Sequence, residues 1–259
     1  MAAVDSRNLD HPKLVEQRAL FRAYLFGTPR LYRGDEELSL ETNRKKCIHI
    51  LSWFLLNPQK PCSADQMVEA LWPDVEPAQA MGRFDVNMHA LKRILQPDLR
   101  PHESSKFVRH HTNRVYSFVF EDSWWSDAAD LELSCHRGYA YDSVGDHVRA
   151  RYYYRRIFTH LSNGPLLGRE SEPWLESYRR KYALMCSQAL TRLVQLEVIH
   201  GVDDEIIEAA YQLLTVEPGN PLASSLILQG VAPSPVGSHE PSLPWPTQDQ
   251  EVGRHLHRR

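Results

Sequence analysis

The sequence changes character near Asp122. Before this point, short apolar runs alternate with turn residues and helical stretches, whereas after it the pattern is almost entirely helical. Such a change predicts two regions with different architectures. With 259 residues, of which 42% are hydrophobic and 24% charged, the chain is long enough for each region to bury a core of its own.

The first region combines strand and helix patterns in a defined order. Residues 21–40 carry apolar runs separated by turn signals, which is typical of a small antiparallel meander. Ser63 and Gln66 have the spacing of a capping box, which marks the start of a helix. The elements predicted after the meander are helices over 44–56, from 63 to a stop at 72–73, and over 77–95, then strands over 106–109 and 115–120.

The third predicted helix has two different faces. An apolar stripe with the spacing i, i+4, i+7, i+11 is expected to face the core, and it consists of Phe84, Met88, Leu91 and Leu95. The opposite face carries Arg83, Val86, His89, Ala90 and Arg93, with Lys92 at its edge. Charged residues on a helix face are usually only solvated. This face therefore indicates a binding surface only if the helix is a recognition helix.

The second region is predicted to be an antiparallel helical domain. Its expected helices cover residues 127–137, 142–160, 171–200, 203–216 and 221–229, with breaks at Gly138, 163–165, Gly201 and 217–220. From Val231 the chain is rich in proline and polar residues, which is typical of a disordered tail. The predicted division is a flexible N-terminus (1–18), a first domain (19–121), a helical domain (123–230) and the tail (231–259).

Several classes of function lack support. No run reaches the roughly 18 apolar residues of a membrane helix, and the N-terminus does not resemble a signal peptide, so a cytoplasmic location without membrane contact is expected. The four cysteines form no C-x-x-C pair and are expected to be reduced and mostly buried. Common catalytic and nucleotide-binding motifs are absent, and neither His110-His111 with His102 nor Cys135-His136 has zinc-ligand spacing. We therefore expect that the protein is not an enzyme and that it binds no cofactor and no metal.

Two motifs, in order, resemble a known family. Residues 60–74, with the sequence KPCSADQMVEALWPD, resemble the core of winged-helix regulators of the OmpR/PhoB class, and more narrowly of the Streptomyces antibiotic regulatory protein (SARP) type. Residues 124–131 resemble the junction that follows in this family. The segments 164–167, 174–176 and 179–182 resemble the signature of its bacterial transcriptional activator domain (BTAD). The resemblance covers about residues 21–229.

The resemblance implies a fold and a function. The fold is an α+β N-terminal winged helix-turn-helix domain followed by an all-α tetratricopeptide-like helical domain. The implied function is transcriptional regulation, more narrowly activation, with double-stranded promoter DNA, RNA polymerase and a second copy of the chain as partners. In this class the third helix enters the major groove and the wing reaches the adjacent minor groove. The protein would then be associated with the nucleoid when bound to DNA.

Carried over to this sequence, the resemblance implies three sets of DNA-contacting residues. They are Arg83, Val86, His89, Ala90, Lys92 and Arg93 on the recognition helix, His110, His111, Thr112, Asn113 and Arg114 on the wing, and Arg44, Lys45 and Lys46 as phosphate contacts.

Some features keep alternatives open. The wing lacks the glycine common before Tyr116, Ala90 stands where an arginine is common, and the net charge is −3. These features favour a protein-interaction adaptor whose helical domain binds partners and whose winged helix has lost DNA affinity. The Arg- and Tyr-rich segment 149–156 leaves room for a small effector, although an ordinary amphipathic helix explains most of it.

Overall fold

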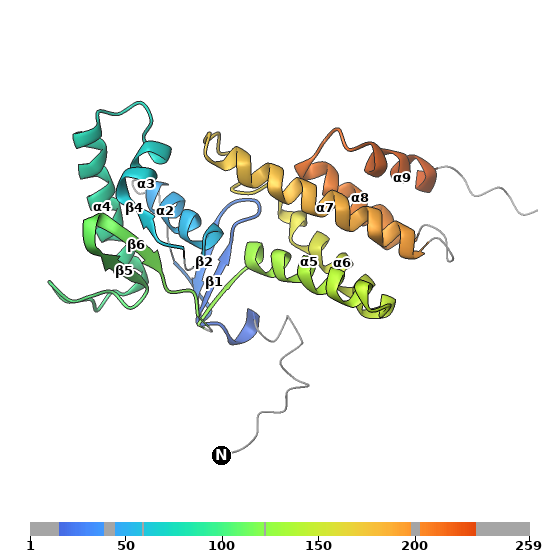
Figure 1. The fold of residues 1–259 in the computed structure, drawn as a ribbon, viewed down its shortest axis with the longest axis horizontal. Coiled ribbons are helices and arrows are strands. Elements are labelled where there is room, and N and C mark those ends of the chain that lie inside the picture. The colour runs from blue at the N-terminus through green and yellow to red at the C-terminus, as the bar shows by residue number, and fades with distance from the viewer. Residues whose placement is uncertain (1–15, 39–44, 59, 122, 198–202, 232–259) are drawn as a thin grey trace, which may run out of the picture.

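The computed structural model describes residues 16–38, 45–58, 60–121, 123–197 and 203–231. In Figure 1 a part built of strands and helices stands beside a part built of helices alone. The predicted fold class, a winged helix followed by a tetratricopeptide-like helical region, is confirmed. The predicted proline-rich tail lies outside the described residues except for Val231, which ends the last helix. Residues 16–18, within the segment predicted to be flexible, form a helical turn whose Glu16 accepts a hydrogen bond from the Tyr24 hydroxyl at 2.7 Å.

The first sheet contains the predicted meander and one additional strand. The meander consists of β1 (Phe21–Tyr24), β2 (Arg30–Arg33) and β3 (Glu36–Glu37), paired antiparallel. β7 (Trp124–Ser126) pairs parallel to β1, so the strand order is β3-β2-β1-β7. The sequence pattern did not predict β7, because three consecutive buried residues show no alternation between two faces.

The winged-helix elements follow the predicted order, apart from the two-residue strand β4, which was not predicted. They are α2 (Lys45–Leu56), β4 (Cys62–Ser63), α3 (Ala64–Leu71), α4 (Pro77–Leu95), β5 (Val108–His111), the 3-10 turn η3 (Thr112–Arg114) and β6 (Val115–Phe118). The sheet order is β4-β6-β5. The capping box is confirmed: Ser63 Oγ accepts a hydrogen bond from the Gln66 backbone at 3.2 Å, and Gln66 Oε1 accepts one from the Ser63 backbone at 3.1 Å.

The helical part consists of packed consecutive helices. They are α5 (Asp127–Ser143), α6 (His147–Thr159), the turn η4 (Leu161–Asn163), α7 (Leu175–Glu197), α8 (Asp204–Val216) and α9 (Pro221–Val231). The predicted break at Gly138 is wrong, since α5 continues to Ser143 and the chain turns at residues 144–146. Gly138 serves close helix packing, because a Cβ atom there would lie 2.7 Å from Cε1 of Tyr154 on α6.

We expect Gly138→Ala to destabilise the protein by about 1–3 kcal/mol, the range typical of overpacking a core. The Tyr154 ring is fully buried and its hydroxyl donates to Asp142 Oδ2 at 3.2 Å, so the ring has little room to move. A matched control is Gly82→Ala on α4, where no atom lies within 4 Å of the added Cβ. This control is expected to gain up to about 1 kcal/mol from helix propensity. Urea unfolding measures both, and equal effects of the two substitutions would contradict the packing role of Gly138.

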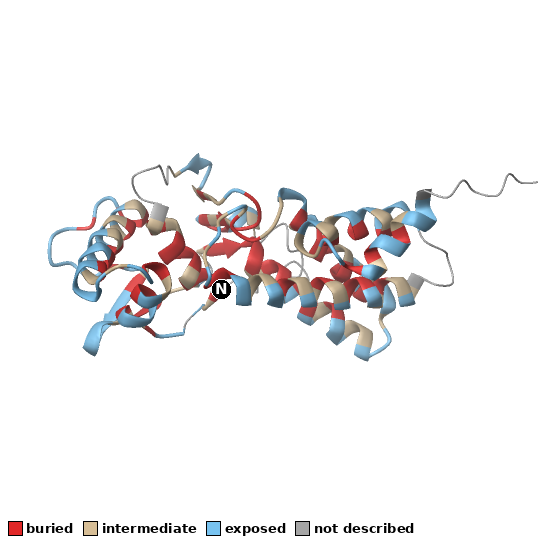
Figure 2. Cartoon of the chain, turned by 90° about the horizontal axis from the view of Figure 1, so that it is seen from above, coloured by how far each residue is buried: buried red, intermediate tan, exposed pale blue. Residues whose placement is uncertain are grey.

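One buried core extends through both parts of the protein. Figure 2 shows buried residues continuing from the sheet into the helices, and a single cluster of buried side chains includes Phe21, Trp124, Leu166 and Tyr182. The tryptophans interpreted as core or junction residues, Trp72, Trp124, Trp125 and Trp174, are all buried. The prediction for the cysteines is also confirmed, since all four are free and buried. None of the described helices combines the length and apolar character that a bilayer-spanning segment requires.

Asp127, the first residue of α5, joins the helical part to the end of β1. Its buried carboxylate accepts hydrogen bonds from the backbone N–H groups of Leu25 at 2.8 Å, Phe26 at 3.0 Å and Ala128 at 2.8 Å. Burial raises its pKa to about 6, and the hydrogen bonds from Phe26 and Leu25 oppose this shift. By accepting hydrogen bonds from three buried donors, this carboxylate holds the start of α5 against the segment that follows β1.

The segment 164–168, which includes residues 164–167 of the BTAD signature, closes the same junction. Leu167 donates its backbone N–H to the Leu25 carbonyl at 2.7 Å, and Gly27 donates to the Pro165 carbonyl at 2.9 Å. Gly27 has φ +75°, and a Cβ there would lie 2.1 Å from the Asn163 carbonyl oxygen, so this approach requires glycine. The guanidinium of Arg179 on α7 donates to the carbonyls of residues 166, 168 and 170. The predicted domain limits remain predictions. β7 lies after the predicted limit at 121–123 but pairs with β1 in the first sheet.

Candidate nucleic-acid interface

Helix α4 is firmly seated on the winged-helix core. Pro77 occupies its first turn, and Glu76 caps it by accepting a hydrogen bond from the Gln79 backbone at 3.0 Å. The predicted apolar stripe is confirmed: Phe84, Met88, Leu91 and Leu95 are buried, together with Ala80. At the other end, the Arg33 guanidinium donates to the Ile94 carbonyl at 2.7 Å and to the Leu95 carbonyl at 2.9 Å. These contacts satisfy carbonyls that the last turn leaves free.

The face opposite the stripe is presented to solvent. Arg83, Val86 and His89 are exposed, and Val86 keeps 70% of its surface accessible. In the described part of the chain, the Arg83 guanidinium has no ion-pair partner. Ala90 differs from this group because it is half-buried and packs against the core. In the N-terminal and central turns of α4, this face therefore presents Arg83, Val86 and His89 to solvent.

The two cations in the last turns of α4 already have partners within the protein. The Lys92 ammonium lies 5.6 Å from the centroid of the Tyr116 ring. Burial lowers the pKa of Lys92, and the nearby Asp85 carboxylate opposes that shift. Arg93 is exposed but donates to the Leu99 carbonyl at 3.0 Å. A ligand phosphate would have to compete with these contacts, so Arg83 is the more available cation.

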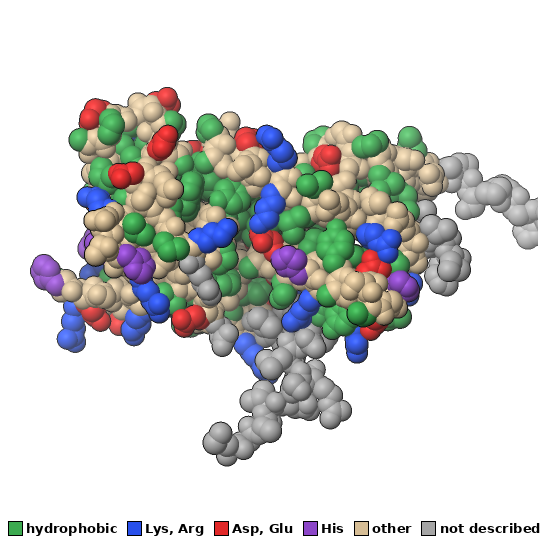
Figure 3. Space-filling model, in the orientation of Figure 1, with side chains coloured by type: hydrophobic (Ala, Val, Ile, Leu, Met, Phe, Trp, Pro, Cys, Tyr) green, Lys and Arg blue, Asp and Glu red, His purple; other side chains and the backbone are tan. Residues whose placement is uncertain are grey.

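The predicted wing is the hairpin of β5 and β6. His110 and His111 lie in β5 rather than in the tip, because they pair with Tyr116 and Val115 of β6. The predicted first strand over 106–109 is therefore shifted by two residues toward the tip. The His110 ring stacks on the Tyr116 ring with centroids 4.9 Å apart, and His111 Nε2 lies 2.8 Å from Ser117 Oγ. Figure 3 shows histidine and cationic side chains over the end of the molecule that carries this hairpin.

The tip of the wing consists of Thr112, Asn113 and Arg114, all exposed. Asn113 has φ +57° and Arg114 has φ +55°, the left-handed conformation that a glycine would adopt more easily. The Arg114 guanidinium forms an ion pair with the carboxylate of Asp85 on α4. The wing tip is thus attached to the predicted recognition helix.

The three predicted phosphate contacts have different positions. Arg44 lies outside the described residues, and Lys45 begins α2. Lys46 forms an ion pair with Glu172 of the helical part, with Nζ and Oε1 2.7 Å apart. The structure therefore places the Lys46 ammonium at the junction between the two parts and not on the face that α4 and the wing share.

Three residues near this interface were not singled out by the sequence analysis. Asp85 binds the wing tip, Arg33 caps α4, and Arg109 is an exposed cation on β5. Arg109 directly precedes the predicted wing, so extending the candidate set by one residue would have included it. The roles of Asp85 and Arg33 depend on contacts 29 and 61 residues away along the chain, which no local pattern reveals.

A cluster of possible metal ligands lies near Lys46. Among the described residues, ligand atoms of His49, Glu170 and Glu172 lie within 4.8 Å of one another. The ammonium of Lys46 contacts the Glu172 carboxylate, and its positive charge opposes binding of a cation there. We interpret this cluster as part of the junction.

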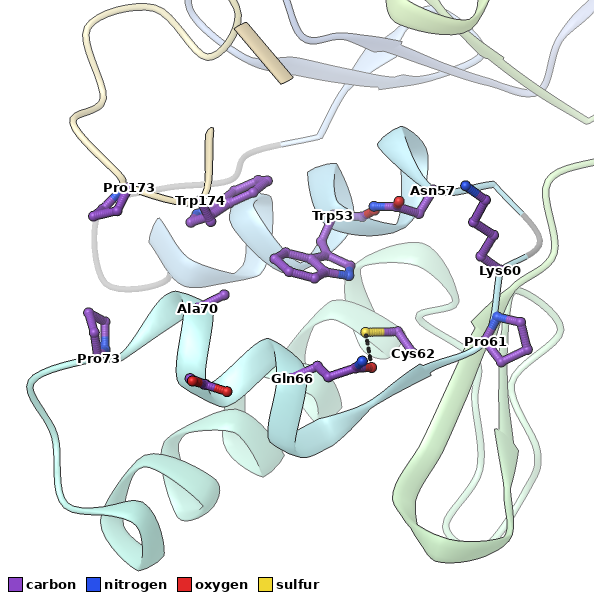
Figure 4. Close-up of a pocket in the computed structure, with 11 residues that line it drawn as sticks. Trp53, Asn57, Lys60, Pro61, Cys62, Gln66, Ala70, Pro73, Pro173 and Trp174 are labelled. Carbon is purple, nitrogen blue, oxygen red and sulfur yellow. Dashed lines mark hydrogen bonds between the residues drawn. The ribbon is translucent and has the colours of Figure 1, made fainter. Parts of the chain in front are cut away.

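A cavity of about 630 Å³ lies between the winged-helix elements and the helical part (Figure 4). Trp53 and Trp174 form one wall, with ring centroids 5.3 Å apart, while Cys62 and Gln66 face them. Burial raises the pKa of the Cys62 thiol, so the sulfur remains protonated and is a poor nucleophile. Asn57 donates to the Tyr178 hydroxyl at 2.6 Å and so links α2 to α7.

The Arg- and Tyr-rich segment is mostly structural. Tyr153, Tyr154 and Arg156 are buried, and Arg156 donates to Asp130 Oδ2 at 2.6 Å. Arg155 pairs with Asp203 at 2.6 Å and with Glu205, both at the start of α8. A groove of about 1040 Å³ between α6 and α8 includes the remaining Arg151 and the exposed Tyr152. Most side chains of the segment therefore hold helices together.

The fold and the exposed α4 face define a winged-helix protein with an attached helical region, and comparisons with known proteins agree with this class. No model of a protein family matches the chain. Regulatory protein AfsR of Streptomyces coelicolor is 22% identical over 215 residues, which cover 83% of this chain and 20% of AfsR. The structure of Mycobacterium tuberculosis EmbR in complex with a low affinity phosphopeptide has a TM-score of 0.51 and 15% identity, covering 83% of this chain and 59% of EmbR.

The match to AfsR, a regulatory protein of Streptomyces, agrees with the resemblance to SARP-type regulators that the sequence motifs indicate. The similarity to EmbR supports the fold over 83% of this chain. The chain spans about a fifth of the length of AfsR, the curated relative it matches.

Proposed function

We propose that this protein is a transcriptional regulator, and more narrowly an activator, that binds double-stranded promoter DNA. Helix α4 enters the major groove, and the β5–β6 wing reaches the adjacent minor groove. The helical part joins two copies of the chain and contacts RNA polymerase. Resemblance to SARP-type regulators, including the AfsR match, supports this role and a function other than catalysis.

The observation that carries the proposal is the arrangement of α4 and the wing. A helix whose inner stripe is buried presents Arg83, Val86 and His89 outward, beside a hairpin with exposed cations. An α-helix fits the major groove of B-form DNA, and arginine donates to guanine or to phosphate. Lys92, Arg93 and Arg114 already contact other groups of the protein, so few cations of this face are available to bind phosphates. Binding of DNA by a single copy is therefore expected to be weak.

Self-association is assigned to the helical part because apolar side chains are exposed there. Val144, Val148 and Tyr152 keep 76%, 71% and 44% of their surfaces accessible near the turn between α5 and α6. Val148 and Tyr152 are one helical turn apart and share a face of α6. Exposed apolar residues of this kind favour a protein contact, and two copies would bind repeated half-sites more tightly than one.

A salt series tests DNA binding directly. In fluorescence-polarisation titrations of the full chain with promoter fragments, we expect the affinity to fall as salt rises, with a log–log slope of about 0.9 for each phosphate neutralised. A scrambled duplex of the same length is the control and is expected to bind more weakly, because a net charge of −3 provides little general attraction. Affinity that is independent of both salt and sequence would contradict the proposal.

The adaptor remains the second candidate, and specific contacts favour it. Two predicted DNA-contacting cations, Arg114 and Lys46, are neutralised by Asp85 and Glu172, and Ala90 is half-buried. An adaptor predicts a protein partner that co-purifies after nuclease treatment, together with no protected DNA. Loss of the partner on nuclease treatment would exclude this candidate.

A further inference from the structure

An acidic residue lies within the proposed DNA-binding face. Asp85 is the single Asp or Glu of α4, and it lies one helical turn before His89. It forms the ion pair with Arg114 of the wing tip, and the two side chains remain 53% and 45% exposed. Its negative charge also acts on Lys92 and on Tyr116. The carboxylate therefore lies among groups from both halves of the proposed interface.

The ion pair has two consequences for the wing. It occupies a guanidinium that the wing would otherwise offer to the DNA backbone. It also contributes to holding Arg114 in the left-handed conformation at φ +55°, which a non-glycine residue adopts only when its surroundings favour it. Because both partners are about half exposed, the pair is weak enough for a phosphate to replace the carboxylate.

We propose that Asp85 is an affinity-determining residue of the DNA-binding face. In the protein without DNA it binds Arg114 and holds the wing tip against α4. When DNA binds, a backbone phosphate takes the place of the Asp85 carboxylate on Arg114, and the carboxylate remains as a like charge near the phosphates. Asp85 thus lowers the affinity for DNA of any sequence. Binding then depends more on the remaining contacts of the α4 face. This inference rests on the proposed DNA-binding function.

The test compares the full-length protein with Asp85→Asn, Arg114→Ala and the double variant in the salt-series titration. Asp85→Asn is expected to bind promoter DNA about fivefold more tightly at moderate salt, with a log–log slope steeper by about one, because no freed carboxylate then takes up a cation that offsets the counterion released when Arg114 contacts a phosphate. The gain is expected to be clearly smaller in the double variant, because the part that acts through Arg114 is lost and only the removal of the like charge remains. Asp98→Asn, in the exposed loop after α4, is the charge-matched control and is expected to change neither quantity.

The outcomes separate the inference from the function on which it rests. If neither the wild type nor any variant binds DNA in a salt-dependent way, the proposed function fails. If the wild type binds DNA and Asp85→Asn has the same or a lower affinity, the function stands and the role of Asp85 is overturned. The role is also overturned if the gain is equally large without Arg114 or if Asp98→Asn produces the same gain.

Discussion

Replacing Asp127 with alanine is expected to lower the free energy of unfolding by about 2–4 kcal/mol. The substitution leaves the backbone N–H groups of Leu25, Phe26 and Ala128 without their acceptor in a place that water does not reach. Each buried donor left unsatisfied costs about 1–3 kcal/mol, and removing the costly buried charge offsets part of this loss. The effect is large because Asp127 joins the end of β1 to the first helix of the helical part.

A control of the same residue type is Asp146→Ala. Asp146 caps α6 by accepting a hydrogen bond from the Arg149 backbone at 3.1 Å, and this contact is exposed. Its loss is expected to cost about 1 kcal/mol, as for an ordinary helix cap. Urea unfolding of both variants gives the comparison. A loss at Asp127 no greater than that at Asp146 would show that the buried contacts do not join the two parts as described.

The pH dependence of Asp127 gives an internal check of its burial. Because burial raises its pKa to about 6, the folded protein takes up a proton at a pH where the unfolded chain remains ionised. Its contribution to stability is therefore greatest at low pH and is lost as the pH rises through 6. Between about pH 7.5 and about pH 5, the stability of the wild type relative to Asp127→Asn should increase by about 1 kcal/mol. A constant difference would contradict the raised pKa.

Arg83→Ala is expected to weaken binding to promoter DNA by about tenfold or more, because an arginine that contacts a base or a phosphate contributes roughly 1–3 kcal/mol. Arg83 lies in the N-terminal half of α4, the part of a recognition helix that reaches furthest into the groove. Arg93→Ala should have a smaller effect, because Arg93 already donates to the Leu99 carbonyl. Polarisation titrations at one fixed salt concentration measure both.

The matched control is Arg180→Ala. Arg180 is an exposed arginine on α7, so its removal changes the net charge equally but lies outside the proposed interface. We expect Arg180→Ala to bind like the wild type. An equal loss for Arg83→Ala and Arg180→Ala would mean that overall charge, and not the α4 face, determines the affinity.

Local patterns were sufficient to predict most of the fold. The capping box at Ser63 and the stripe of Phe84, Met88, Leu91 and Leu95 depend on residues within a few helical turns, and the structure confirms both. Two of the errors concern long-range packing. A glycine such as Gly138 often ends a helix, but here it lies within α5 because the Tyr154 ring packs against it. β7 forms because it pairs with the edge of β1, about a hundred residues earlier in the chain.

The candidate site was less predictable for the same physical reason. Helix periodicity identified which side of α4 carries Arg83, Val86 and His89, and these residues are exposed. It did not show that Lys46 pairs with Glu172 or that Arg114 pairs with Asp85, since both contacts join distant segments. The net charge of −3 likewise does not show which cations lack a partner within the protein. The availability of each cation for DNA depends on its local contacts, which only the structure shows.

The most direct test of the proposed function is genome-wide footprinting of the wild type and of Arg83→Ala in the native cells. The proposed function predicts a discrete set of protected promoter sites for the wild type, arranged as repeated half-sites, and the loss of that protection in Arg83→Ala. No protected sites for the wild type, or the same sites with equal occupancy in the variant, would contradict DNA recognition through α4.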